Sequence, residues 1–147
     1  MAEIHARHPA RLVAVAGRPI GNLLLPIPIL CFLGAVLTDW SYLGSGGNLT
    51  WLFFSTWLIP VGLVFGGLTA LFLLIDGIRV GGGRWIALGL LAAAWIVEFF
   101  NALVHMRDGW TAVAGAGFIL SIIGTLLALA AGWFAADDRR VLVREEA

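Results

Sequence analysis

Three polar residues within one long apolar segment carry the side chains best suited to chemistry in this chain. Glu98, Asn101 and His105 lie three and four positions apart, so they share one face if the segment is a helix. A carboxyl group, an amide and an imidazole in a row can relay protons, because imidazole titrates near neutrality and burial favours an uncharged carboxyl group. The same side chains can instead form interhelical hydrogen bonds that only fix the register of neighbouring helices. The spacing is compatible with both roles.

The elements that must position these residues are apolar segments that make up most of the 147-residue chain. The sequence is 61% hydrophobic and 12% charged, which is too little charge for the surface of a soluble domain. A membrane span requires about 20 residues as helix, and helix satisfies the backbone within one segment. We therefore predict an all-α fold, a polytopic bundle of four transmembrane helices. The expected spans cover about residues 20–38, 51–75, 85–104 and 112–134.

The distribution of arginine predicts the orientation in the membrane. All nine basic residues are arginine, and eight of them lie in segments on the same side of the spans, Arg107 being the exception. The positive-inside rule then places both termini in the cytoplasm, and we predict a multi-pass protein of the bacterial cytoplasmic (inner) membrane. Residues 1–18 form a basic N-terminal arm, residues 19–136 the transmembrane domain and residues 137–147 a charged cytoplasmic tail.

Glu98 would lie about 10 Å deeper in the membrane than His105, at 1.5 Å per residue. An ionised carboxylate at that depth costs several kcal/mol unless it is paired. We therefore expect Glu98 to face the bundle interior and to be protonated or hydrogen-bonded. The neighbouring Phe99 and Phe100 leave the lipid-facing side of this helix ambiguous.

A second group of polar residues borders the outer ends of the first and third spans. Asp39 ends the first span, and Arg107, Asp108 and Trp110 follow the third. We predict that these four residues form an outer docking face. We expect one polar cluster on the outer side of the membrane, made of Asp39, Glu98, Asn101, His105, Arg107 and Asp108. No nucleophile lies next to a base, so no catalytic residue is predicted, and no metal site is predicted either.

Small residues four positions apart predict where helices meet, because they let two backbones approach closely in lipid. They serve packing within the bundle or the face of a homodimer. The residues in question are Gly62, Gly66, Gly117, Ser121, Gly124, Ala128 and Gly132.

Two stretches of the sequence are similar to a known family. The residues from Gly17-Arg18-Pro19-Ile20 through Leu25-Pro26-Ile27-Pro28-Ile29 open the first span, and Asn101 to Trp110 lead into the fourth. These stretches resemble domain-of-unknown-function family 2231, predicted bacterial four-helix membrane proteins. Many relatives have a His-Pro pair where this chain has Gly21-Asn22. The resemblance implies an accessory role near redox enzymes, such as a periplasmic-side dehydrogenase or a cytochrome.

The leading functional prediction is a non-catalytic accessory or anchor subunit that docks a partner at its outer face. The alternative is a redox- or proton-linked membrane component that binds a quinone or similar ligand near Glu98 and His105. A second alternative is an oligomeric small-solute transporter. The lipid bilayer is the expected environment, a homo-oligomer is one possible assembly, and no nucleic-acid partner is expected.

Overall fold

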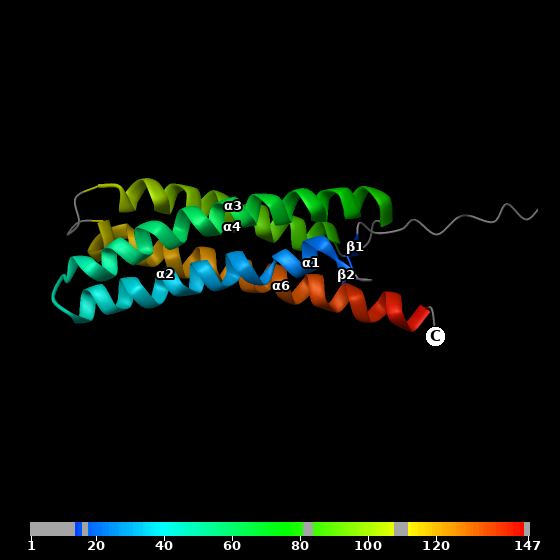
Figure 1. Ribbon diagram of the computed structural model, residues 1–147, viewed down its shortest axis with the longest axis horizontal. Coiled ribbons are helices and arrows are strands. Elements are labelled where there is room, and N and C mark those ends of the chain that lie inside the picture. The colour runs from blue at the N-terminus through cyan, green and yellow to red at the C-terminus, as the bar shows by residue number, and fades with distance from the viewer. Residues whose placement is uncertain (1–13, 16–17, 81–83, 108–111, 146–147) are drawn as a thin grey trace, which may run out of the picture.

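Four long helices run side by side in the computed structural model and form one bundle (Figure 1). The structure describes residues 14–15, 18–80, 84–107 and 112–145, with side chains at 20–79, 84–107 and 112–136. The elements in chain order are β1 (Ala14–Val15), β2 (Arg18–Pro19), α1 (Ile20–Leu24), α2 (Pro26–Gly44), α3 (Leu49–Val80), α4 (Arg84–His105), the π-helical turn η1 (Val113–Gly117) and α6 (Phe118–Glu145). The two strands form a short antiparallel pair.

The predicted all-α fold of four membrane-crossing helices is confirmed. Each helix is long and apolar enough to span a membrane, over the ranges Ile20–Gly44, Leu49–Arg79, Arg84–His105 and Val113–Ala136. Helices α3 and α6 extend further than the predicted spans, because charged residues after an apolar run do not themselves stop a helix. The segment predicted as a charged tail is therefore helical as far as Glu145. Most of the predicted N-terminal arm lies outside the described residues.

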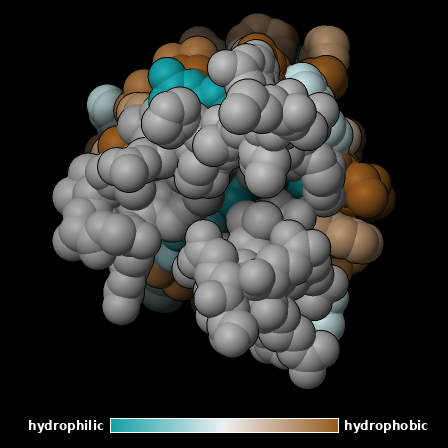
Figure 2. Space-filling model, turned by 90° about the vertical axis from the view of Figure 1, so that its right-hand side faces the viewer, coloured by the Kyte–Doolittle hydropathy of each residue, from teal (hydrophilic) through white to brown (hydrophobic). Residues whose placement is uncertain are grey.

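We call the two ends of the bundle the loop end and the terminal end. At the loop end α2 passes into α3, and at the terminal end α1 begins and α6 finishes (Figure 1). The turn at the loop end contains Gly46 and Gly47, with φ angles of 70° and 93°, a conformation that only glycine adopts without strain. Figure 2 views the molecule from the terminal end, where hydrophobic surface lies around the sides.

The distribution of side chains is that of a protein surrounded by lipid. Large hydrophobic residues point outward, and Trp57, Ile78 and Trp133 are 62%, 70% and 76% exposed. The interior instead holds many alanines, such as Ala35 and Ala94, which are fully buried. Because lipid is as apolar as these side chains, helices in it associate through close packing rather than through burial of apolar surface.

The first span is interrupted near its N-terminal end. Leu25 separates α1 from α2, and Pro26 opens α2. Proline has no N–H and clashes with the preceding turn, so a helix ends or bends before it. Leu25 is nonetheless buried and donates its N–H to the Gly21 carbonyl at 3.0 Å. The interruption is therefore a local bend within one span.

The glycines of α3 serve packing within the chain. A side chain at Gly62 would overlap the ring of Phe32, which is fully buried on α2. Gly66 lies between Trp95 and Pro28 at ordinary contact distances of 3.5 and 3.6 Å for a methyl group. Gly62 and Gly66 thus let α2 and α4 pack closely against α3, and they do not lie on an outer face available to a second copy of the chain.

A buried ion pair lies near the terminal end. Arg84 Nη1 lies 3.3 Å from Asp76 Oδ2, and both side chains are almost fully buried. Asp76 and Arg79 lie three positions apart on α3, a spacing that would allow them to pair. Asp76 lies against Arg84 of the next helix instead, and Arg79 is exposed. Arg84 reaches Asp76 because α3 and α4 are antiparallel neighbours.

We expect Gly62→Ala to lower the free energy of unfolding by about 1–3 kcal/mol, because the added methyl group displaces a fully packed ring. Gly66→Ala is the matched control on the same helix and should have a much smaller effect. Reversible unfolding in mixed detergent micelles measures both. Equal effects at the two positions would contradict the packing described for Phe32.

Arg84→Gln should destabilise the bundle by about 3 kcal/mol or more, because it leaves the Asp76 carboxylate buried without its cation. Arg79→Gln removes the same charge from an exposed position and should leave stability unchanged. The same unfolding measurement applies. A loss of stability in the Arg79 variant, with none in the Arg84 variant, would overturn this assignment of the ion pair.

Candidate functional site

A group of buried polar side chains joins three helices in the half of the bundle nearest the loop end. We call it the polar network. Each member is at most 3% exposed. Its members are Asp39 on α2, Glu98, Asn101 and His105 on α4, and Ser121 on α6.

The inner face of α4 positions three of the five members. Its buried residues recur every three or four positions, and at Glu98 this stripe changes from apolar to polar. Phe99 and Phe100 are 42% and 56% exposed, so they lie on the outer face and Glu98 on the inner one. Three consecutive residues of a helix cannot all point to the same side. The structure thus shows that the two phenylalanines, and not Glu98, lie on the lipid-facing side of α4.

Hydrogen bonds connect Glu98 to Asp39 through an amide and a hydroxyl group. The Asn101 side-chain nitrogen donates to Glu98 Oε2 at 2.9 Å and to Ser121 Oγ at 2.8 Å. The Ser121 hydroxyl donates in turn to Asp39 Oδ2 at 2.7 Å. This chain of bonds crosses from α4 to α6 to α2, so it fixes the relative positions of three helices.

His105 completes the network from the last residue of α4. Its Nδ1 lies 3.1 Å from the Asn101 backbone carbonyl, and its Nε2 lies 3.0 Å from Asp39 Oδ1. A carbonyl oxygen only accepts, so Nδ1 must carry a proton. One further proton lies between Nε2 and Oδ1. The His105–Asp39 pair therefore has zero net charge whichever atom holds that proton.

Three oxygen atoms around the network have no hydrogen-bond partner in the described structure. They are Glu98 Oε1, Asn101 Oδ1 and Thr125 Oγ1, all completely buried. A buried polar atom without a partner costs about 1–3 kcal/mol. Such atoms are therefore places where a proton or an internal water molecule adds stability.

Glycines on α6 make room for the two titratable side chains of α4. A Cβ atom at position 124 would overlap the carboxyl group of Glu98, including Oε1. A Cβ atom at Gly117 would lie 3.0 Å from His105 Cε1 and would also overlap the Ala112 carbonyl. The small residues of α6 thus set the space in which the network forms.

The π-helical turn η1 leads into α6 next to His105. Gly115 within it has φ −92° and ψ −110°, outside the helical region. Here the turn ends at Gly117, so it brings that glycine against the imidazole.

The structure does not place the four predicted docking residues on one exposed face. Asp39 is fully buried and bonded to His105 and Ser121, so it belongs to the polar network rather than to a surface. Its prediction as a docking residue is wrong, because a carboxylate at a helix end need not face water when a histidine is within reach. Arg107 is exposed. Asp108 and Trp110 lie outside the described residues.

The predicted packing residues also divide into two groups. Ala128 is fully buried, and Gly132 lies against Ile29 of α2, as expected of contacts between helices. Ser121 is instead the link between Asn101 and Asp39. The sequence contained a signal for this hydrogen-bonding role, because Ser121 and Thr125 carry the only hydroxyl groups in the predicted fourth span.

Within the described ranges, no three histidine, cysteine, aspartate or glutamate side chains are arranged to hold a metal ion. No family model matches this chain, and neither the curated proteins nor the solved structures give a match. The fold and its exposed apolar surface define a multi-pass membrane protein with a buried polar network.

Gly124→Ala should force Glu98 out of its position and break its hydrogen bond to Asn101. We expect a loss of about 1–3 kcal/mol in the free energy of unfolding, since overpacking is added to the loss of a bond. Gly132→Ala is the control on the same helix, because only the flexible end of Ile29 must move there. Unfolding in detergent micelles separates the two. Equal stability of both variants would show that Glu98 does not lie against position 124.

Proposed function

We propose that this protein is a proton-linked membrane component in which Glu98 binds and releases a proton. The observation that supports this proposal is that hydrogen bonds hold Glu98 and the Asp39–His105 pair in one buried network. The Asn101 amide nitrogen donates both of its bonds, so it positions Glu98 rather than passing a proton. A network used only to fix helix register could consist of neutral amides and hydroxyls. This network instead places two carboxyl groups and an imidazole together at membrane depth, where ionisable groups are expensive.

The two carboxyl groups have different surroundings, and this difference supports distinct roles. Both oxygens of Asp39 face a hydrogen-bond donor, Ser121 or His105, which favours the carboxylate. Glu98 has one donor at Oε2 and none at Oε1. A proton on Glu98 avoids an incompletely paired buried charge. Glu98 is thus the proton-binding group and the Asp39–His105 pair its electrostatic partner.

A proton fits the network better than a quinone does. A quinone headgroup requires a cleft that can hold it, with polar side chains free to bond to it. The members of the network are buried and bond mainly to one another. Quinone binding near Glu98 and His105 is therefore the less favoured alternative to proton binding at the same residues.

The accessory role remains a separate proposal. Arg107, which is exposed at the loop end, is the residue that would contact a partner such as a periplasmic-side dehydrogenase. Isolation of the tagged protein from its own membranes, followed by comparison of wild type with Arg107→Glu, tests it. Loss of one recovered protein in the variant would support docking at this face, and identical recovery would oppose it.

Membership of the four-helix family of unknown function, the bacterial inner membrane and cytoplasmic termini are likewise proposals. The arginine asymmetry supports the orientation. With it, the loop end of the bundle faces the outside of the cell.

Glu98→Gln should lower by about one the number of protons that each chain exchanges in a pH jump. It keeps the size of the side chain and its bond to Asn101 but removes the titrating group. Proton uptake is measured with a pH indicator in weakly buffered micelles, and thermal unfolding verifies assembly. Leu126→Met, on the exposed face of α6, is the unchanged control. If Glu98→Gln folds and takes up as many protons as the wild type, the network has only a structural role.

A further inference from the structure

We infer that the polar network exchanges protons through the loop end of the bundle alone, because two apolar layers close it from the terminal end. This inference rests on the proposed function, since it concerns the route by which a proton reaches Glu98. It adds a direction: the protein would sense or buffer protons on one side of the membrane rather than conduct them across it.

The network reaches the loop end through His105. This residue ends α4 and is 3% exposed, and the next two residues, Met106 and Arg107, are exposed. On α2, Trp40 follows Asp39 and is 68% exposed. Within the network, His105 and Asp39 therefore lie nearest to the loop end of the bundle, and Glu98 lies farthest from it.

The first apolar layer lies one helix turn beyond Glu98. It consists of Phe32 on α2, Ala94 on α4 and Ala128 on α6, which pack together and have no exposed surface. Ala94 precedes Glu98 by four residues, and Ala128 follows Gly124 by four, so this layer lies directly beneath the carboxyl group. None of its side chains can donate or accept a hydrogen bond.

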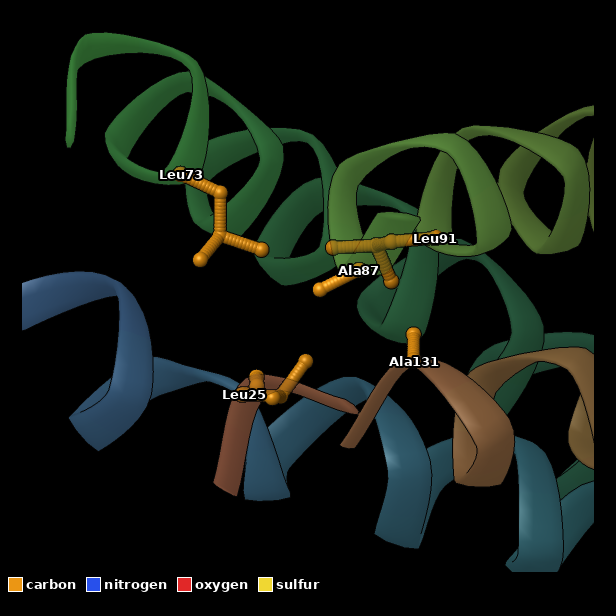
Figure 3. Close-up of a cluster of buried hydrophobic side chains, with 6 residues drawn as sticks. Leu25, Leu73, Ala87, Leu91 and Ala131 are labelled. Carbon is orange, nitrogen blue, oxygen red and sulfur yellow. The ribbon is translucent and has the colours of Figure 1, made fainter. Parts of the chain in front are cut away.

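The second layer lies one further turn toward the terminal end. Figure 3 shows its side chains pointing toward one another from different helices. Leu73 of α3 and Leu91 of α4 face each other across it, with Leu25 at the junction of α1 and α2. The remaining members are Ala87, Ala131 and Ala135.

The nearest charges beyond these layers are those of the Asp76–Arg84 pair. Fourteen residues of α4 separate Glu98 from Arg84, which is about 21 Å along the helix. Thr69 of α3 is fully buried in this region, and its hydroxyl group donates to the Phe65 carbonyl of its own helix at 2.7 Å. Proton transfer needs a chain of hydrogen-bonding groups, and the side chains of the two apolar layers provide none.

The titratable groups near Glu98 belong to the loop end as well. Asp39 and Tyr42 come from α2, and His105 comes from α4. The charged residues of α3 are Asp76 and Arg79, both near the terminal end, and α6 carries no charge before Asp137. Cys31 is the one ionisable side chain of the first layer's surroundings, and it packs beside position 62 of α3.

The experiment is a one-sided pH jump on sealed vesicles that contain the full-length protein in one orientation. Gly44→Cys provides an exposed thiol at the loop end, in open space, so a membrane-impermeant maleimide reports the orientation. The readout is the infrared carbonyl band that disappears in Glu98→Gln. We expect this band to respond within the mixing time to a jump at the loop end, and at least tenfold more slowly to a jump at the terminal end.

Each result has a distinct meaning. A fast response from the terminal end, or equal responses from both ends, overturns the one-sided route while leaving proton binding at Glu98 intact. A band that responds to neither jump, or that persists in Glu98→Gln, overturns the proposed function itself.

A variant of the second layer provides an independent check. Leu91→Gln introduces hydrogen-bonding groups between the network and the Asp76–Arg84 pair, and it should accelerate the response from the terminal end. Leu91→Met conserves volume and polarity and should leave the response one-sided. If Leu91→Gln does not assemble, the wild-type comparison still decides the question.

Discussion

The hydrogen bond between His105 and Asp39 is the interaction on which the rest of this bundle's polar interior depends. It unites residues that lie 66 positions apart, and it lets a carboxylate remain at membrane depth because an imidazole lies beside it. Ser121 adds α6 to the same carboxylate. Without this pair, Asp39 would be an uncompensated charge at membrane depth. Helices α2, α4 and α6 would also lose the hydrogen bonds that fix their relative positions.

Close approach of the helices is the second requirement, and small residues provide it. Helices α4 and α6 run antiparallel with matched contacts, in which Glu98 meets Gly124, Asn101 meets Ser121 and His105 meets Gly117. Each member of the polar network on α4 thus faces a glycine or serine. Toward the terminal end alanines replace these partners on both helices. The same interface is polar in one half and apolar in the other because the residues of α4 change while its spacing does not.

The sequence predicted the fold well, because long apolar runs in a membrane protein have one conformation available to them. It also predicted that Glu98, Asn101 and His105 share a face, since that follows from helical spacing alone. It also placed Asp39 in a polar cluster with them, but it did not predict the hydrogen bonds of Asp39 to His105 and Ser121. Contacts between distant segments depend on the rotation and height of each helix. Ser121 was assigned to packing for the same reason. Its small size and its hydroxyl group are both consistent with its position, and only the neighbouring helices determine which property matters.

The pairing of Arg84 with Asp76 illustrates the same limit. Spacing along α3 favoured Arg79, whereas the antiparallel return of α4 brings Arg84 closer to the carboxylate. Local spacing predicts which residues can interact within a helix. It does not include competitors from the next helix, and in a bundle those competitors are often better placed because they approach from the buried side.

The missing side chain at Gly124 has a consequence for the evolution of this chain. The carboxyl group of Glu98 occupies the volume that any larger residue at position 124 would need. The two positions are therefore coupled: alanine at 124 costs less stability in a chain that has already shortened or lost the acid at 98. A chain that has acquired alanine at 124 pays the same cost if it later regains the acid.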